Sequence, residues 1–354
     1  MAEAIALAAT HLGQTSTNPS VGCVIVKDGK AVGRGVTAKS GRPHAEPQAL
    51  AEAGELARGA TAYVTLEPCS HFGKTPPCVN ALIAAGVSRI VVAVTDPDPR
   101  VSGNGIRMLR EAGIAVETGL MEEAARRGLA AYLTRQIEGR AHVTLKLAVS
   151  RDGMLGRQGE GQIRITGAQS REAVQHLRAE SDAILVGIGT ALADDPELTC
   201  RLPGLEDRSP VRLVLDRALQ LPLSSKLVQT AGDVPVIAVV PADANARDVD
   251  WLARRAALIE AGVEIVEADS PLDLLRAQAA RGFSSLLVEG GARVAGDFLK
   301  AGLVDRIWLF EGPGPVGEPG IRSPLSPGHK PDGFALVSTE TMGEDRLEIF
   351  ERIK

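Results

Sequence analysis

Short apolar runs alternate with helical patterns along nearly the whole chain, and this alternation restricts the fold more than any other feature. Runs such as "ATAYVTL" (60–66), "RIVVAV" (89–94) and "DAILVGIGT" (182–190) are predicted to be buried strands. Segments of helical length lie between them and stop at glycine. Strands that alternate with helices predict an α/β fold, because each helix must bury its apolar stripe on a sheet.

The chain is predicted to contain two such domains. At 354 residues it is long for one domain. A helix from residue 122 to about 137 ends at "EGR" (138–140), and a second alternation follows. We therefore divide the chain into residues 1–139 and 140–354. "DRIWLF" (305–310) is expected to be the last strand, and the Pro- and Gly-rich stretch 312–333 is expected to be loop.

Composition argues against nucleic-acid and membrane partners. The net charge is −5, and aromatic residues make up 3% of the chain, so neither a basic surface nor a stacking platform for bases is expected. No apolar run approaches the ~18 residues of a membrane span, and no positive charge precedes the apolar N-terminal run as a secretory signal requires. A cytoplasmic protein with reduced thiols is expected. Cys23 and Cys200 lie in apolar strand-like runs and are interpreted as core residues.

The other two cysteines belong to a pattern of metal ligands. "PHAE" places His44 and Glu46 at the start of a predicted helix. "EPCSHFGKTPPC" places Cys69 after a strand and Cys78 at the start of another helix. Residues i and i+2 of a helix point apart, so His44 and Glu46 can converge only on a group at the helix tip. One His and two Cys give three zinc ligands and leave a fourth position for water. Glu46 is then assigned to proton transfer in the hydrolytic deamination of an amino-pyrimidine or purine.

Two structural interpretations stand beside this catalytic one. The pattern could be a helix-capping His next to two core thiols without zinc. Alternatively, His71 could supply a fourth ligand and close a purely structural zinc site. The catalytic interpretation is favoured because all the parts occur in the expected order, each with strand or helix context.

The motifs "TNPSVGCVIVKDG", "PHAE" and "TLEPCSHFGKTPPC" resemble the cytidine-deaminase-like superfamily, which has His-x-Glu followed by Pro-Cys-x-x-Cys. Here eight residues separate the cysteines, and this long loop resembles the bacterial bifunctional riboflavin-biosynthesis enzymes. Those enzymes fuse a diaminohydroxyphosphoribosylaminopyrimidine deaminase to a 5-amino-6-(5-phosphoribosylamino)uracil reductase. The resemblance implies a cytidine-deaminase-like α/β/α domain in which His44, Cys69 and Cys78 hold Zn²⁺ and Glu46 is the proton donor.

The same resemblance implies three substrate contacts in this domain. Asn18 matches a superfamily position near the substrate, although an ordinary Asn-Pro turn explains it equally well. His71 and Lys74 lie in the loop between the cysteines and could meet the substrate's phosphate. A solvated loop is the equally simple alternative for both.

Residues 140–354 resemble the reductase domain of that family, whose fold is dihydrofolate-reductase-like α/β. Three motifs carry the resemblance in the family's order: "LKLAVSRDG", "LRAESDAILVGIGTALADDPELTCR" and "LVEGGARVAGDFL". Glycines between a strand and a helix, as in the last motif, let the backbone approach a phosphate. The implied NADP(H) contacts are Ala148, Arg164, Thr190, Asp194, Arg217, Gly291, Ala292 and Arg293. The implied substrate contacts are Arg178, Leu198, Arg201 and Glu289.

Plainer interpretations exist for several of these positions. Asp194 could be a helix cap, Arg178 a solvated helix face and Glu289 an edge carboxylate. Arg164 and Arg217 depart from the family, which often has Trp and Ser or Thr there. An Arg at either position could contact the NADP 2′-phosphate, or the cofactor contacts could be rearranged.

The sequence therefore predicts a bifunctional enzyme of riboflavin synthesis that acts on small phosphoribosylated pyrimidines with zinc and NADPH. The resemblance also implies a homo-oligomer formed through the reductase domain. One alternative is a nucleic-acid base deaminase with an unrelated appended domain, which the acidic pI of about 5.8 and the reductase-like half oppose. Another is a zinc protein without catalytic activity.

Overall fold

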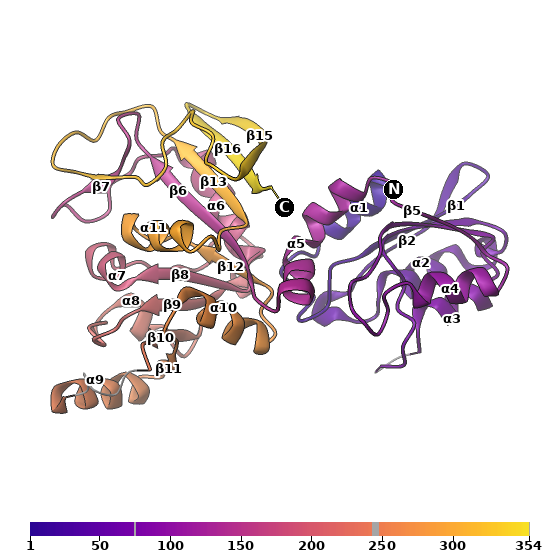
Figure 1. Cartoon of the computed structure of the whole chain (residues 1–354), viewed down its shortest axis with the longest axis horizontal. Coiled ribbons are helices and arrows are strands. Elements are labelled where there is room, and N and C mark those ends of the chain that lie inside the picture. Colours follow the sequence, from indigo (N-terminus) through magenta and orange to yellow (C-terminus); the bar gives the residue numbers. More distant parts are fainter. Residues whose placement is uncertain (74–75, 243–247, 354) are drawn as a thin grey trace. The chain divides into compact units, whose positions relative to one another are not determined.

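The structure of the chain, a computed structural model, describes residues 1–73, 76–242 and 248–353. It divides into two compact units, Met1–Gly139 and Arg140–Lys354 (Figure 1). The division follows helix α5 (Glu122–Glu138) and precedes strand β6 (His142–Val149). Gly139 ends α5 with a φ of 64°, a left-handed conformation that glycine adopts without steric cost.

The N-terminal unit is a five-stranded sheet between two layers of helices, which confirms the expected α/β/α arrangement. The strand order is β2-β1-β3-β4-β5. Helices α1 and α5 pack together, and so do α2, α3 and α4 (Figure 1). The strands are β1 (Gly22–Lys27), β2 (Lys30–Val36), β3 (Thr61–Leu66), β4 (Arg89–Val94) and β5 (Ala115–Thr118). The helices before α5 are α1 (Ala2–Ala9), α2 (Ala45–Ala53), α3 (Cys78–Ala84) and α4 (Asn104–Glu111).

Helix α2 lies unusually close to the hairpin of β1 and β2. A side-chain carbon on Gly35 would lie 2.0 Å from the Ala45 carbonyl oxygen, and one on Gly33 would lie 2.1 Å from that of Ala49. Only glycine fits at such separations, so the two glycines set the depth at which α2 packs on the sheet. Because His44 is the N-cap of α2, this contact also sets the position of the predicted metal ligand.

The C-terminal unit is built on a nine-stranded sheet of order β11-β10-β9-β8-β12-β6-β13-β16-β15. Its strands from β11 to β13 are parallel, and β16 and β15 extend one side in antiparallel fashion. The strands after β6 are β8 (Ala183–Gly187), β9 (Val211–Leu215), β10 (Val236–Val240), β11 (Glu264–Glu267), β12 (Ser285–Val288), β13 (Arg306–Glu311), β15 (Phe334–Met342) and β16 (Asp345–Arg352). A separate pair is formed by β7 (Met154–Arg157) and β14 (Gly320–Arg322).

Helices cover this sheet as the alternation of the sequence predicts (Figure 1). They are α6 (Ala168–Ala179), α7 (Ile188–Asp194), α8 (Lys226–Gln229), α9 (Val249–Glu260), α10 (Pro271–Ala280) and α11 (Ala292–Lys300). The main apolar cores lie on the two faces of the sheet, so both faces of the parallel part are buried, as such sheets require.

The structure corrects three expectations for this unit. The strand predicted for 182–190 ends at Gly187, which is extended and caps α7. The stretch 312–333 is not all loop, because it contains β14. The strand β13 is not the last, since β15 and β16 follow it. Many side chains of β15 are exposed, so this strand lacks the apolar run that marks a buried one.

Cys23 and Cys200 are buried, 0% and 2% exposed, which confirms that they are core residues. Within the described ranges, no helix has both the length and the apolar character needed to cross a bilayer.

Candidate active sites

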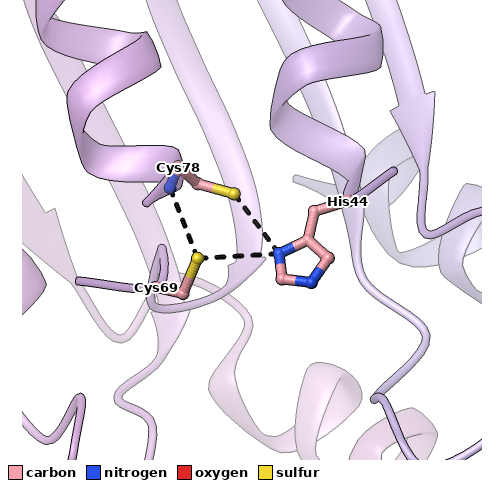
Figure 2. Close-up of side chains that lie close together, drawn as sticks. All are labelled: His44, Cys69 and Cys78. Carbon is pink, nitrogen blue, oxygen red and sulfur yellow. Dashed lines mark hydrogen bonds between the residues drawn. The ribbon is translucent and has the colours of Figure 1, made fainter. Parts of the chain in front are cut away.

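Three predicted metal ligands converge in the N-terminal unit (Figure 2). His44 precedes α2, Cys69 follows β3, and Cys78 is the first residue of α3. The His44 Nδ1 atom lies 3.6 Å from the Cys69 sulfur and 3.3 Å from the Cys78 sulfur. The three ligand atoms lie within 4.8 Å of one another.

This spacing fits a zinc ion. Tetrahedral bonds of about 2.0–2.1 Å to nitrogen and about 2.3 Å to sulfur separate the two ligand atoms by roughly 3.5 Å. The measured N–S separations lie close to this value. Among the described residues no fourth His, Cys, Asp or Glu joins this cluster, and His71 is outside it. The geometry therefore supports the open arrangement with three protein ligands over the closed site that His71 would complete.

Protonation of the two thiols is already uneven. A hydrogen bond from the Cys78 side chain lowers the pKa of the Cys69 thiol to about 4, and His44 and the backbone N–H of Cys78 add to the effect against the cost of burial. The pKa of Cys78 is raised, chiefly because it donates to Cys69. The lowered pKa of Cys69 favours its thiolate, which is the form of cysteine that binds metal.

Glu46 lies beside these ligands at the start of α2 and is 3% exposed. Burial and, to a lesser extent, the charge of Cys69 raise the pKa of its carboxyl group to about 6, against the opposing charge of His44. A carboxyl group with a pKa near neutrality can both accept and return a proton.

Glu67 supports the loop that carries Cys69. Its buried carboxylate accepts backbone N–H groups of Gly103 at 3.0 Å, of Ile106 at 3.2 Å and of Asp96 at 3.3 Å. Glu67 therefore ties the end of β3 to the start of α4, two residues before the metal ligand. Sequence reasoning missed this role, although a carboxylate at the end of a buried strand was a visible signal.

Two of the three predicted substrate contacts of this unit, Asn18 and His71, belong to the described residues. Asn18 packs over Gly41, where a side-chain carbon would lie 2.2 Å from its Nδ2 atom, so Asn18 borders the loop that leads to His44. His71 is half-buried, and its Nδ1 atom has no hydrogen-bond partner among the described residues. Lys74 lies outside the described residues.

A cleft of about 1560 Å³ opens in the C-terminal unit. It lies at the carboxyl ends of β8, β9, β10 and β12, which is where open parallel sheets bind their ligands. The structure brings every predicted contact of this unit to the cleft wall. These are Ala148, Arg164, Arg178, Thr190, Asp194, Leu198, Arg201, Arg217, Glu289, Gly291, Ala292 and Arg293.

Two helix starts meet in the cleft. Gly291 is the N-cap of α11, and a side-chain carbon on it would lie 3.3 Å from the Thr190 hydroxyl in the first turn of α7. Backbone N–H groups at helix starts favour anions. The donor set suits the pyrophosphate of a dinucleotide such as NADPH.

Arg178 and Glu289 form a buried pair instead of a solvated helix face and an edge carboxylate. Arg178 Nε and Nη2 donate to the Glu289 carboxylate at 2.8 and 3.1 Å. The strand β12, which Glu289 follows, lies inside the sheet. Burial alone would raise the pKa of Glu289, but the charges of Arg178 and Lys146 outweigh it and lower the pKa to about 2.

Comparison with known proteins covers both units. The family model "Cytidine and deoxycytidylate deaminase zinc-binding region" matches residues 1–94, and the model "RibD C-terminal domain" matches residues 141–347. The riboflavin biosynthesis protein RibD of Aquifex aeolicus is 41% identical over 99% of this chain and 96% of its own length. The chain belongs to the RibD family.

Solved RibD structures have the same fold. RibD of Acinetobacter baumannii is 36% identical and superposes with a TM-score of 0.86 over 100% of this chain and 98% of that chain. A deaminase/reductase of Thermotoga maritima is 33% identical, with a TM-score of 0.85 over 100% of this chain and 97% of that chain. In the comparison of sequences, RibD of Escherichia coli is 42% identical over 88% of this chain and 86% of its own length.

Membership of the RibD family confirms the predicted function. The chain is a bifunctional deaminase and reductase of riboflavin biosynthesis, with a zinc-binding deaminase domain and a reductase domain that uses NADPH. The alternative of a nucleic-acid deaminase with an unrelated second domain is wrong, because both halves match one family.

Lys146 is a candidate residue of the RibD reductase cleft that sequence reasoning missed. It lies in β6 and lines the cleft, and its Nζ atom is 3.7 Å from a Glu289 oxygen. Burial lowers its pKa. A lysine inside the apolar run "TLKLAV" was the signal, because a charged side chain on a central strand needs a partner.

Proposed function

We propose that His44, Cys69 and Cys78 bind the zinc ion and that Glu46 transfers protons in the deaminase reaction. The substrate would be 2,5-diamino-6-(5-phosphoribosylamino)pyrimidin-4(3H)-one, in which water replaces the ring amine and ammonia leaves. The single observation that carries the proposal is the convergence of one ring nitrogen and two sulfurs beside a buried carboxyl group.

Zinc, when bound, supplies a Lewis acid that makes water nucleophilic near neutral pH. Glu46 takes the proton released by the attacking water and delivers it to the departing amine. Its burial keeps bulk water from competing for that proton. Asn18 contacts the substrate, and His71 and Lys74 meet its phosphate.

A pair of variants on one helix tests this role. Glu46→Gln is expected to keep zinc and abolish ammonia release, because the amide cannot carry the proton. Glu52→Gln is the matched control, since Glu52 also lies in α2 but its side chain is 51% exposed. Both proteins would be assayed for zinc content and ammonia release. Unchanged ammonia release by zinc-loaded Glu46→Gln would disprove the role of Glu46.

For the second reaction, we propose that the cleft of the C-terminal unit holds 5-amino-6-(5-phosphoribosylamino)uracil beside NADPH, which supplies the hydride for ribose C1′. The starts of α7 and α11 hold the cofactor phosphates, with Thr190, Asp194, Gly291, Ala292 and Arg293 in contact. Ala148, Arg164 and Arg217 complete the cofactor side, and the two arginines offer charge to the 2′-phosphate.

The substrate side of the cleft is built around Glu289. Three of the five N–H groups of Arg178 are engaged, two by Glu289 and one by the Thr199 carbonyl at 3.1 Å. Arg178 thereby orients Glu289, and Arg201 offers a more exposed guanidinium to the substrate phosphate. Leu198 forms the apolar wall.

Stepwise assays, with the diaminopyrimidine given first alone and then with NADPH, separate ammonia release from NADPH oxidation.

The chain is further proposed to be cytoplasmic and to form homo-oligomers through the reductase domain. Both expectations come from the family resemblance. Light scattering of the whole chain and of residues 140–354 would test the assembly, and a monomeric whole chain would disprove it.

A further inference from the structure

Arg212 is an arginine inside an apolar core. It lies in β9 and is 0% exposed. Its neighbours in register are Ile184 of β8 and Val236 of β10, which belong to one buried apolar cluster. Burying a charged group costs several kcal/mol unless its donors are satisfied, and an apolar side chain of similar volume is often as stable. Stability of the core alone therefore does not explain this arginine.

The guanidinium group of Arg212 binds oxygen atoms of two separate segments, at Glu197 and in the turn from Thr230 to Val234. Nη1 donates to the Glu197 carbonyl at 3.1 Å and to the Thr230 hydroxyl at 2.7 Å. Nη2 donates to the Thr230 carbonyl at 2.9 Å and to the Val234 carbonyl. Burial lowers the pKa of Arg212 to about 10, against the charges of Asp233 and Glu197, so the group is charged at neutral pH. These are charge-assisted hydrogen bonds, which are stronger than neutral ones.

One of these bonds fixes the backbone next to a strained residue in the cleft. Leu198 follows Glu197 and has a φ of 57°. A left-handed conformation costs about 1–2 kcal/mol for a residue with a side chain, and it persists only where the surroundings impose it. Leu198 is 3% exposed and belongs both to the core that surrounds Arg212 and to the cleft wall.

The rest of this segment is also held. Arg178 donates to the Thr199 carbonyl, and the Gln175 side chain accepts the backbone N–H of Arg201 at 2.7 Å. Arg178 and Gln175 belong to α6, whereas Arg212 holds the segment from the sheet. The segment 197–201 is thus clamped from two sides, and Arg212 supplies the clamp nearest to Leu198.

We propose that Arg212 is a positioning residue of the reductase site, which holds Glu197 so that Leu198 and Arg201 present the correct surface to the substrate. The proposal rests on the proposed substrate role of those two residues. Arg212 touches neither substrate nor cofactor, because its side chain is enclosed in the core. Its effect is therefore expected in substrate affinity and not in NADPH affinity.

The test uses the whole chain with zinc, so that the deaminase reaction serves as an internal control. Arg212→Met removes every donor but keeps an apolar chain of similar length. The matched control is Thr230→Val, which removes the hydroxyl partner of the guanidinium and leaves the Glu197 contact. Four quantities would be measured: the KM and kcat for the uracil substrate, the Kd for NADPH from quenching of tryptophan fluorescence, the rate of ammonia release, and the thermal midpoint.

Arg212→Met is expected to raise the KM for the uracil substrate by about tenfold or more, the equivalent of one lost charge-assisted contact. The Kd for NADPH and the rate of ammonia release should not change. Thr230→Val should lower the thermal midpoint and leave KM unchanged. The proposal is wrong if both variants raise KM in proportion to the fall in their thermal midpoint. It is also wrong if KM is unchanged in Arg212→Met.

If Arg212→Met does not bind NADPH, its KM for the uracil substrate cannot be measured, and a second variant is used. Arg212→Lys keeps a charge and fewer donors, and a folded Arg212→Lys with an unchanged KM would also overturn the proposal. A prior assay of the unaltered chain separates failure of the proposed reductase function from failure of the Arg212 proposal. The unaltered chain must oxidise NADPH when it is given the uracil substrate. If it does not, the proposed reductase function fails, whatever the variants do.

Discussion

Arg140 and Asp305 form a buried bidentate ion pair, in which the two guanidinium Nη atoms each lie 2.7 Å from a carboxylate oxygen. The pair joins the first residue of the C-terminal unit to the residue directly before β13. Asp305 also accepts the backbone N–H of Val143 at 2.9 Å, so one carboxylate fastens the start of β6. Neither side chain is more than 6% exposed.

Asp305→Asn is expected to destabilise the C-terminal unit by about 3–5 kcal/mol, because it leaves a buried cation without its carboxylate. Glu264→Gln is the matched control, since it breaks a bidentate pair with Arg281 whose side chains are 50% and 36% exposed. That loss should be below about 1 kcal/mol. Urea unfolding of both variants measures the difference, and equal losses would contradict the expectation.

The contribution of Asp305 should depend on pH in a defined direction. Burial alone would raise its pKa, but the hydrogen bond from Arg140 and the charges of His142 and Arg140 lower it below the usual value. Because the pKa of Asp305 is lower in the folded state, Asp305 stabilises the folded state fully at pH values above its unfolded pKa of about 3.9. This stabilisation disappears as pH falls through the pKa of the folded state. The gap in unfolding free energy between the unaltered chain and Asp305→Asn should therefore narrow below about pH 4. A gap that is constant down to pH 2 would show that Asp305 does not titrate in this way.

Removal of zinc should separate the two activities. A chelator is expected to abolish ammonia release and leave NADPH oxidation intact, because the described part of the reductase unit contains no comparable cluster of ligands. Thiol titration supplies a second readout. Cys69, which is half-buried, should become reactive on chelation, while the buried Cys23 and Cys200 stay protected. Loss of both activities on chelation would contradict the assignment.

Gly35→Ala should damage the metal site through packing. The added methyl group would meet the Ala45 carbonyl at 2.0 Å, so α2 must move away from the sheet and displace His44 and Glu46. A destabilisation of about 1–3 kcal/mol and weaker zinc binding are expected. Gly128→Ala is the control, because nothing lies within 4 Å of the added carbon. In the interior of α5 it should stabilise by about 0.5–1 kcal/mol.

Glu289→Gln should impair the reductase selectively. It leaves Arg178 and Lys146 without their shared carboxylate, so kcat/KM for the uracil substrate should fall while NADPH binding and ammonia release remain. The pKa of Glu289 is about 2. Glu289 is therefore ionised above about pH 4. A fall in reductase activity toward acid pH that occurs above pH 4 would not come from protonation of Glu289, so it should persist in Glu289→Gln. Disappearance of this fall in the variant would show that Glu289 titrates in that range.

The sequence predicted the convergence of His44, Cys69 and Cys78 better than it predicted the residues that support them. His44, Cys69 and Cys78 could be found because each ligand sits at a strand or helix end with a short local motif. Glu67 was visible as a carboxylate at the end of a buried strand, but its role could not be predicted, because its three backbone partners are 29 to 39 residues away. The same limit applies to Arg212, whose partners come from two segments that only the tertiary fold brings together.

Secondary structure was predictable wherever burial dominated. The central strands of both sheets read as apolar runs, as strands buried on both faces must. The start of α7 was hidden, because Ile188 continues the apolar run of β8 and only the fold shows where the helix begins. In β15 most side chains are exposed, so pairing with β16 stabilises this strand more than burial does.

The change from one unit to the other at Gly139 and Arg140 has a consequence for metabolic supply. Each translated polypeptide delivers one deaminating centre and one reducing centre, so their ratio is fixed at synthesis and no difference in expression can alter it. Any mismatch between the two successive steps must then be absorbed by turnover rates or by the loading of zinc and NADPH, and not by the amount of protein.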